Sequence, residues 1–313
     1  MNTAGHRIRV NADNVITYGV LPVTFLFGSV GNVISLRILT ARKFNFLKTS
    51  VGVYLTALAF ADVNVTCVYV PVLFVRIYFD QLVLSHGFCK AYEILGSGAI
   101  STSNMLLTLM TFDRYLVVRF PLKAKSICRP RKASKIISVL LVVQALRLVP
   151  QGVLSGVGDN ARGLDCFSRY DPTIPAIYEQ IFTVLSNAIF SLILPVFFTI
   201  GANLAMIYSL QSQRSEIKHK LSTQSKDSSL NFLVLVISVV LVLTHLPRLI
   251  YYFHIWAYDV FRYMGGATLY FFEHVLYYCS ESLILTNSAV NFYVYCLSSR
   301  RFRVGAKSLF CRR

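Results

Sequence analysis

The stretch that decides the fold is CKAYEILGSGAISTSNMLLTLMTFDRYLVV, residues 89–118. It is a long, mainly apolar run, and about 20 such residues suffice for a helix to cross a bilayer. Asp113-Arg114-Tyr115 stands near its end and opens a basic segment. Arg114 is permanently charged, and its guanidinium can pair with Asp113 or with groups on adjacent helices. A snorkelling ion pair at a helix end is the structural interpretation. A switch that releases Arg114 to another protein is the functional one.

The composition of the whole chain agrees with a membrane protein. Hydrophobic residues make up 55% of its 313 residues and charged residues only 14%, whereas a soluble domain carries about 25% charged residues. Apolar runs of about 20 residues recur, without the alternating polarity of a membrane barrel. We therefore expect an all-α membrane protein, a seven-transmembrane helix bundle. The predicted spans are Ile16–Thr40, Val51–Ile77, Cys89–Val118, Ser134–Val157, Ala176–Leu210, Ser229–Trp256 and Leu269–Leu297.

The distribution of charge predicts the topology. Most of the 31 Lys and Arg residues flank the spans on one side, and the positive-inside rule makes that side cytoplasmic. We expect an extracellular tail at 1–15, a seven-transmembrane domain at 16–298, and a cytoplasmic amphipathic helix and tail at 299–313 of a multi-pass plasma-membrane protein. The polar first residues contain no cleavable signal peptide, so the first span is expected to direct insertion.

The net charge of +17 is split among short segments that flank the membrane. Nucleic-acid binding needs the basic residues gathered on one face, so no nucleic-acid partner is expected. Attraction to anionic lipids of the inner leaflet explains much of this charge, so membrane lipids are the expected partners.

Several polar residues lie deep in the predicted spans. An Asn in hydrocarbon needs hydrogen-bond partners on another helix, and Asp62 is the partner expected for Asn32. Two interpretations of Asp62 stay open: a structural polar knot with Asn32, or an ion or proton site that changes between states. The only cofactor considered is a sodium ion near Asp62. Asn287, Ser288 and Asn291 call for a similar network in the last span.

Two cysteines are best placed on the oxidising side of the membrane. Cys89 begins the third span and Cys166 lies in the loop after the fourth, so a disulfide between them is expected. Cys311, beside Phe310 and Arg312 on the cytoplasmic side, is a candidate for palmitoylation.

Taken together, these residues resemble the rhodopsin-like (class A) G-protein-coupled receptors over nearly the whole chain. The stretch from Asp113 to Pro121 and the basic residues after it look like the branch with purinergic, hydroxycarboxylic-acid and lysophospholipid receptors. The matching pieces are Gly31-Asn32, Leu58-Ala59-x-Ala61-Asp62, Cys89 with Cys166, Asp113-Arg114-Tyr115, Pro195, Pro247 and Asn287-Ser288-x-x-Asn291-x-x-x-Tyr295.

The chain departs from this family at four points. The only Trp is Trp256, so the Trp usual in the fourth span is absent. His245 replaces the usual aromatic residue before Pro247, and Asn203 replaces a Tyr of the fifth span. Phe292 replaces a Pro, and we expect it to leave the seventh span straighter.

The resemblance implies a cell-surface receptor that passes binding of an extracellular ligand to a heterotrimeric G protein. It implies that Asp113, Arg114, Tyr115, Asn291 and Tyr295 form the switch. In receptors of this kind, the cytoplasmic end of the sixth span moves outward and the arginine meets the G protein.

The same resemblance implies a ligand pocket between the third, fifth, sixth and seventh spans. Our hypothesis is that Arg248 or Arg147 binds the anionic group of a small metabolite or lipid. The alternative is an internal salt bridge, of Arg248 with Glu281 or of Arg147 with Glu93. His245 is either a proton sensor or a neutral hydrogen-bond partner. The residues expected to form the pocket are Glu93, Ser97, Arg147, His245, Arg248, Tyr252, Tyr277 and Glu281.

Two other functions are weighed against this one. A receptor-like protein that does not signal, as a decoy or partner, would accommodate the departures at Phe292, His245 and Asn203. A small transporter would use the intramembrane charges, but the sequence has no inverted repeats. An enzyme is not expected, because no nucleophile elbow, phosphate loop or metal-ligand spacing is present.

Overall fold

The computed structural model describes residues 15–78, 85–154, 156–160, 163–167, 188–217, 225–261 and 267–310. Three of its membrane-spanning helices contain π-helical turns. The first span joins η1 (Val15–Val20), α2 (Leu21–Val23), η2 (Thr24–Gly28) and α3 (Ser29–Thr40); the second joins α4 (Ser50–Asn64), η5 (Val65–Tyr69) and α5 (Val70–Tyr78); the fifth joins η7 (Ile189–Ile193) and α11 (Leu194–Ile217).

The other spans are single helices, and shorter elements connect them. The long helices are α6 (His86–Arg119), α8 (Pro130–Leu154), α12 (Ser225–Phe261) and α13 (Ala267–Ser298). The shorter elements are the 3-10 turns η3 (Arg42–Phe44) and η4 (Phe46–Lys48), helices α7 (Pro121–Ile127) and α14 (Arg300–Phe310), and an antiparallel hairpin of β1 (Gly156–Asn160) and β2 (Gly163–Phe167).

The predicted spans match these helices in order, with one boundary wrong. The fourth span was expected to reach Val157, but α8 ends at Leu154 and Val157 lies in β1, opposite Cys166. The sequence did carry a stop signal, since Ser155 and Gly156 follow Leu154 directly and glycine commonly ends a helix. The start of the predicted fifth span, residues 176–187, lies outside the described residues.

Within the described residues, five helices are long and apolar enough to cross a membrane. They run Tyr18–Thr40, Ser50–Phe74, Pro130–Pro150, Ile189–Ser212 and Asn231–His254. Helices α6 and α13 are longer but more polar. Their polar side chains, such as Ser103, Asn104 and Asn291, are buried inside the bundle, where other helices replace lipid as the neighbours.

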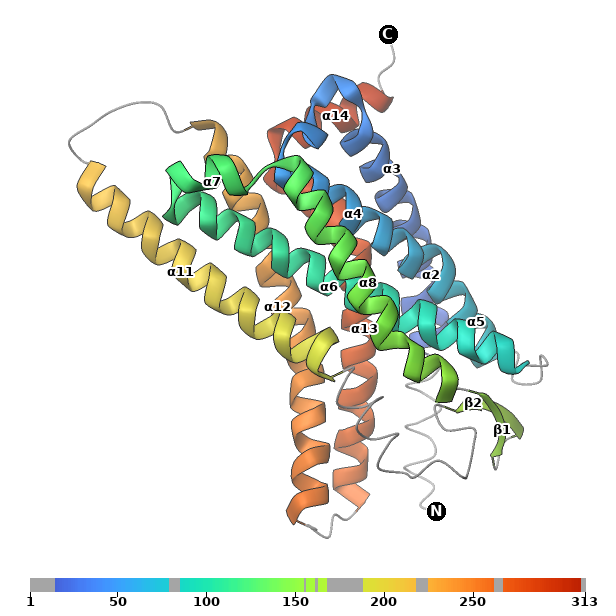
Figure 1. The fold of residues 1–313 in the computed structure, drawn as a ribbon. Helices are drawn as coiled ribbons and strands as arrows, with labels where there is room; N and C mark the ends of the chain where they lie inside the picture. Colours follow the sequence, from blue (N-terminus) through green and yellow to red (C-terminus); the bar gives the residue numbers. More distant parts are fainter. Residues whose placement is uncertain are drawn as a thin grey trace.

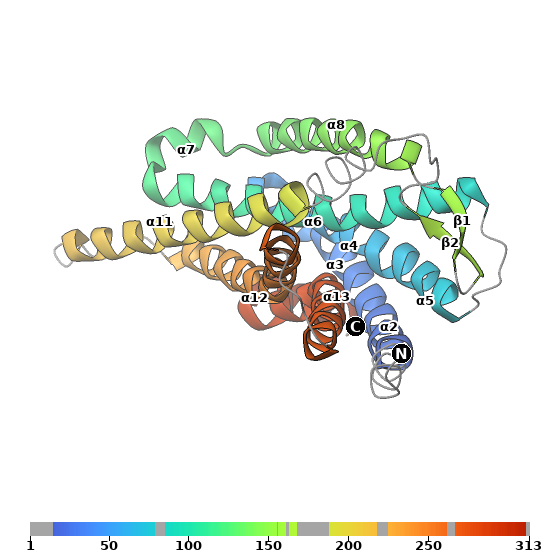
Figure 2. The same cartoon turned by 90° about the horizontal axis from the view of Figure 1, so that it is seen from below.

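Helix α6 is the centre of the bundle. It packs against α4, α8, α11 and α12, and seen from below it runs between α8 and α4 (Figure 2). Helices α7 and α14 lie at one end of the bundle and the hairpin at the other (Figure 1). We call these the α14 end and the hairpin end.

Among the described residues, the apolar core forms two clusters of unequal size. The larger cluster of buried side chains lies toward the α14 end, where Tyr54, Met110, Tyr295 and Phe302 are almost wholly buried. A smaller cluster, which includes Leu21, lies toward the hairpin end.

Candidate functional site

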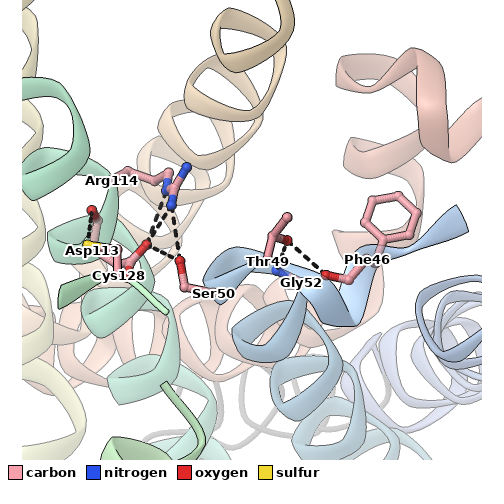
Figure 3. Close-up of polar contacts among 7 residues, drawn as sticks. All are labelled: Phe46, Thr49, Ser50, Gly52, Asp113, Arg114 and Cys128. Carbon is pink, nitrogen blue, oxygen red and sulfur yellow. Dashed lines mark hydrogen bonds and ion pairs between the residues drawn. The ribbon is translucent and has the colours of Figure 1, made fainter. Parts of the chain in front are cut away.

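The Asp113–Arg114 pair is buried at the α14 end of α6. Arg114 is 6% exposed and Asp113 7%. Arg114 Nη2 donates to Asp113 Oδ2 at 2.7 Å and to Ser50 Oγ at 3.2 Å, and Ser50 Oγ donates to the same carboxylate oxygen at 2.8 Å (Figure 3). The guanidinium is therefore held inside the bundle by one carboxylate and one hydroxyl.

Ser50 is fixed by the start of α4. The preceding Thr49 caps this helix, since its hydroxyl oxygen accepts from Gly52 N at 3.1 Å and its hydroxyl donates to Phe46 O at 2.8 Å (Figure 3). A Cβ atom on Gly52 would collide with the backbone carbonyl of Phe46. Only glycine lets the turn before α4 fold back this closely.

Cys128 contacts the same cluster from the segment between α7 and α8. Its thiol donates to the backbone carbonyl of Asp113, with Sγ 3.6 Å from the oxygen. Burial raises the pKa of the Cys128 thiol to about 12, and the negative charge of Asp113 adds to the effect. The thiol is therefore a neutral donor that ties this segment to the Asp113 backbone.

Asp62 is fully buried near the middle of the bundle. Ser103 Oγ donates to Asp62 Oδ1 at 2.7 Å, and Asn291 Nδ2 donates to Oδ2 at 2.6 Å. The expected Asn32–Asp62 bond is wrong, because Asn32 Nδ2 donates to the backbone carbonyl of Ser288 at 2.9 Å. Helices α3 and α13 pack closely, so the Asn32 amide bonds to the main chain of α13 and not to Asp62 on α4.

Three polar atoms around this core have no hydrogen-bond partner within the described residues. They are Asn32 Oδ1, Asn287 Oδ1 and the Tyr295 hydroxyl. Buried polar atoms in folded proteins are nearly always paired with protein, water or an ion. The region around Asp62 therefore has spare oxygen atoms that a bound water or cation would satisfy.

The sixth and seventh spans are joined toward the hairpin end by an ion pair. Arg248 Nη2 donates to Glu281 Oε2, and both side chains are 14% exposed. The guanidinium also lies 4.8 Å from the ring centroid of Tyr277, 5.8 Å from Tyr251 and 5.9 Å from Tyr252. The internal salt bridge weighed from the sequence is thus formed, and Arg248 is not an unpaired cation.

His245 lies in a polar contact between three helices. Asn104 Nδ2 donates to the backbone carbonyl of Ser191 at 2.8 Å and to His245 Nε2 at 2.9 Å, while His245 Nδ1 lies 2.9 Å from the carbonyl of Leu241. A carbonyl only accepts and an amide N–H only donates, so these partners select the neutral tautomer with the proton on Nδ1. This geometry favours the hydrogen-bond role over the proton sensor.

Arg147 has a partner that was not expected from the sequence. Its Nε donates to Gln144 Oε1 at 2.8 Å, and Gln144 Nε2 donates to Ser101 Oγ at 2.8 Å. The side chain of Glu93 lies outside the described part of the chain, so the Arg147–Glu93 pair stays a prediction. Ser97 is half-buried in α6.

Other expected site residues have mixed outcomes. Tyr115 packs against Phe112 and Phe120, with ring centroids 5.9 Å and 6.4 Å away, and no described hydrogen bond joins it to the switch. Cys89 is disulfide-bonded. Its pairing with Cys166 stays a prediction, because the side chain of Cys166 lies outside the described part of the chain. Cys311 also lies outside the described residues, so its palmitoylation stays a prediction as well.

Two departures from the family pattern make specific contacts. Phe292 packs against Gly31 and lies 5.9 Å from the ring of Phe302, and α13 continues through it as a regular α-helix. Asn203 Nδ2 donates to Ser238 Oγ at 2.8 Å, and Ser238 Oγ donates back to Asn203 Oδ1 at 3.1 Å. These two bonds join α11 to α12.

Sequence reasoning missed four uncharged partners. They are Ser50 at Arg114, Ser103 at Asp62, Asn104 at His245 and Gln144 at Arg147. Asn104 and Gln144 did carry a signal, since each is an amide within an apolar run and must find a partner.

Comparison with known proteins gives one consistent family. The chain matches the family described as 7 transmembrane receptor (rhodopsin family) over residues 31–295. It is 24% identical to neurotensin receptor type 1 of Mus musculus, over 94% of this chain and 76% of that receptor. It is 24% identical to galanin receptor 2a of Danio rerio (95% and 78%) and to the substance-P receptor of Homo sapiens (94% and 69%).

These relatives do not support the branch with purinergic, hydroxycarboxylic-acid and lysophospholipid receptors. The family match covers most of the chain and includes the Asp113–Arg114 pair, the Asp62 core and the whole of α6. This protein belongs to the rhodopsin family of seven-transmembrane receptors, and it is a cell-surface G-protein-coupled receptor.

Proposed function

We propose that this receptor responds to an extracellular peptide and activates a heterotrimeric G protein at the α14 end of the bundle. The observation that carries the proposal is the buried Arg114, held by Asp113 and Ser50. A ligand that favours another helix arrangement would shift the population toward a state in which this guanidinium is exposed.

The α14 end suits a cytoplasmic docking surface. It carries the basic segments that the positive-inside rule assigns to the cytoplasm, which agrees with an extracellular amino terminus. Leu122 on α7 is 83% exposed, close in sequence to Arg114. An acidic or carboxylate-ended helix would find positive charge and an apolar contact here.

A peptide suits the Arg248–Glu281 region better than a small anion. The charge of Arg248 is already neutralised, so an anion would have to displace Glu281 and leave a carboxylate unpaired. Peptide amides and side chains offer both donors and acceptors, and three tyrosines surround the pair. The related receptors named for neurotensin, galanin and substance P bind peptides.

Nucleotide exchange on a panel of purified G proteins tests the coupling step. Arg114→Ala should abolish exchange, since the proposed contact with the G protein is lost. Arg119→Ala is the matched control, because Arg119 is exposed on the same helix outside the cluster. Equal exchange by wild type and Arg114→Ala would show that the receptor does not couple through this guanidinium.

A sodium ion fits the Asp62 region. In the described part of the chain no lysine or arginine pairs with Asp62, and a buried carboxylate needs a cation or a proton. The oxygens of Asp62, Ser103 and Asn287 are the groups that would hold it, and its charge would stabilise the resting packing. We expect sodium to weaken agonist binding to wild type and to leave Asp62→Asn unaffected, as measured by agonist titration in sodium and in choline buffers.

A further inference from the structure

The Arg248–Glu281 pair is held by a single hydrogen bond. Helices α12 and α13 lie side by side in the bundle (Figure 1), and Arg248 Nη2 on α12 donates to Glu281 Oε2 on α13. Arginine and a carboxylate can form two parallel bonds, but no second one joins this pair, and neither side chain forms another hydrogen bond with the described residues. Glu281 Oε1 therefore keeps its acceptor sites, and the guanidinium keeps N–H donors.

The pair can be reached by a ligand but is shielded from bulk water. Each side chain keeps 14% of its surface exposed. The rings of Tyr251, Tyr252 and Tyr277 surround the guanidinium, and Tyr251 and Tyr277 also contact each other, with ring centroids 5.4 Å apart. Electrostatic interactions are stronger in such a setting than in water. The charge of an arriving group therefore strongly affects its binding.

Within the described residues, the pair has no net charge and no further charged partner. Arg248 and Glu281 neutralise each other, and no other described ion pair includes either of them. His245, three residues before Arg248 on α12, is held in its neutral form by its contacts with Asn104 and the Leu241 carbonyl. A ligand group that contacts both members of the pair therefore meets a donor and an acceptor whose charges cancel.

These features distinguish between the groups that a peptide can present. A free terminal carboxylate competes with Glu281 for one guanidinium and leaves a net negative charge in a nearly buried site. A terminal ammonium leaves a net positive charge beside Arg248. Both arrangements are costly, because a charge that is removed from water needs a full partner. A primary carboxamide is neutral, and it carries an acceptor oxygen beside two N–H donors.

We propose that the Arg248–Glu281 pair binds the primary carboxamide of a peptide, which comes from an amidated carboxyl terminus or from the side chain of an Asn or Gln. The carbonyl of this group accepts from a free N–H of Arg248, and its nitrogen donates to Glu281 Oε1. The bond between the two residues stays intact, so neither charge loses its partner. This inference rests on the proposed function, because it assumes a peptide ligand.

Affinity selection of synthetic hexapeptides on the purified receptor in phosphatidylcholine nanodiscs tests the proposal. The first pool ends in a carboxamide and contains neither Asn nor Gln, and the second has the same sequences with a free carboxylate. The third has free carboxylates and one Gln, placed at each position in turn. Bound peptides are quantified by mass spectrometry. We expect wild type to retain the amides of the first pool at least about tenfold over the matching acids of the second, which corresponds to about 1.4 kcal/mol.

A change in the charge of the pair should change the preferred group. Glu281→Gln leaves Arg248 as an unpaired cation, which favours a carboxylate, so the acids of the second pool should then bind better than the amides of the first. Arg248→Glu combined with Glu281→Arg restores a neutral pair and should restore the preference for amides. Ser282→Ala is the matched control and should retain the same peptides as wild type, because the Ser282 hydroxyl donates to Tyr278 O within α13.

The outcomes separate this inference from the proposed function. Equal retention of amides and acids by wild type, or an unchanged preference for amides in Glu281→Gln, would overturn the carboxamide site and leave a peptide receptor. Retention of no hexapeptide from any pool would overturn both. Stronger binding of the third pool than of the second would identify a side-chain amide as the bound group, and binding of the first pool alone would identify the terminal amide. The comparison on wild type needs no variant, so it decides the matter even where a substitution prevents folding.

Discussion

Ser50 is the residue whose hydroxyl joins α4 to the Asp113–Arg114 pair. It accepts from the guanidinium and donates to the carboxylate, so its loss removes the described hydrogen bonds between the ion pair and α4. Hydrogen bonds to charged groups contribute about 1.5–3 kcal/mol. We therefore expect Ser50 to help hold the resting state, although it belongs to no motif.

Ser50→Ala should raise basal nucleotide exchange about tenfold, because a shift of about 1.4 kcal/mol changes a population ratio by that factor. The measurement is ligand-independent exchange on a G protein that wild type activates. Ser126→Ala is the matched control, since its hydroxyl donates to Lys123 O within α7. Basal exchange equal to wild type would mean that Ser50 does not restrain Arg114.

The Arg248–Glu281 pair carries a second prediction at the residue scale. Arg248→Glu or Glu281→Arg alone leaves two like charges close together in a nearly buried site, which should reduce peptide potency more than tenfold. The double exchange restores the pair and should recover part of that loss in a concentration–response assay. If both single variants retain full potency, this pair lies outside the ligand site.

At the scale of the elements, two reciprocal hydrogen bonds between Asn203 and Ser238 join α11 to α12. By resemblance, the end of α12 moves outward on activation, which stretches these two hydrogen bonds. The departure from the family pattern at Asn203 thus places a short, reciprocal contact where α11 and α12 must separate.

Asn203→Ala and Ser238→Ala should each raise basal exchange about three- to tenfold, for bonds of about 1 kcal/mol each. The double variant should gain little more, because either change alone breaks the same contact. Ser209→Ala is the control on α11, where the hydroxyl donates only to Ala205 O. Additive increases would show that the two residues act through different partners.

Phe292 changes α13 at the same scale. With a proline here, the carbonyl of Ser288 would lose its helical N–H partner. With Phe292, the helix runs unbroken to Ser298, and the Ser288 carbonyl accepts from Asn32 as well. Movement at the α14 end of α13 therefore depends on packing against Gly31 and Phe302 rather than on a proline bend.

At the scale of the whole molecule, the order of the spans and the charged contacts were predictable. Charge in hydrocarbon is costly and must be paired, which is why Asp113 was considered as a partner of Arg114, and why the Arg248–Glu281 pair was weighed as the alternative to an anion site. Hydroxyl partners such as Ser50 and Ser103 were not, because serine is tolerated on any helix face and the sequence does not give helix rotation. The hairpin was missed although Ser155 and Gly156 mark the end of the helix, because its short strands hold too few apolar residues to show an alternating pattern.

Within the described residues, the larger apolar core lies toward the α14 end, and we expect the local stabilities of the two described clusters to differ. Regions with few buried apolar contacts open at a lower free energy than a packed core. Backbone amides near Leu21 and Leu285 would thus exchange their protons for deuterium through small openings, while those near Tyr54 and Met110 would wait for rarer, larger ones. We expect a bulky ligand to enter through the first kind of fluctuation without loosening the surface proposed to meet the G protein.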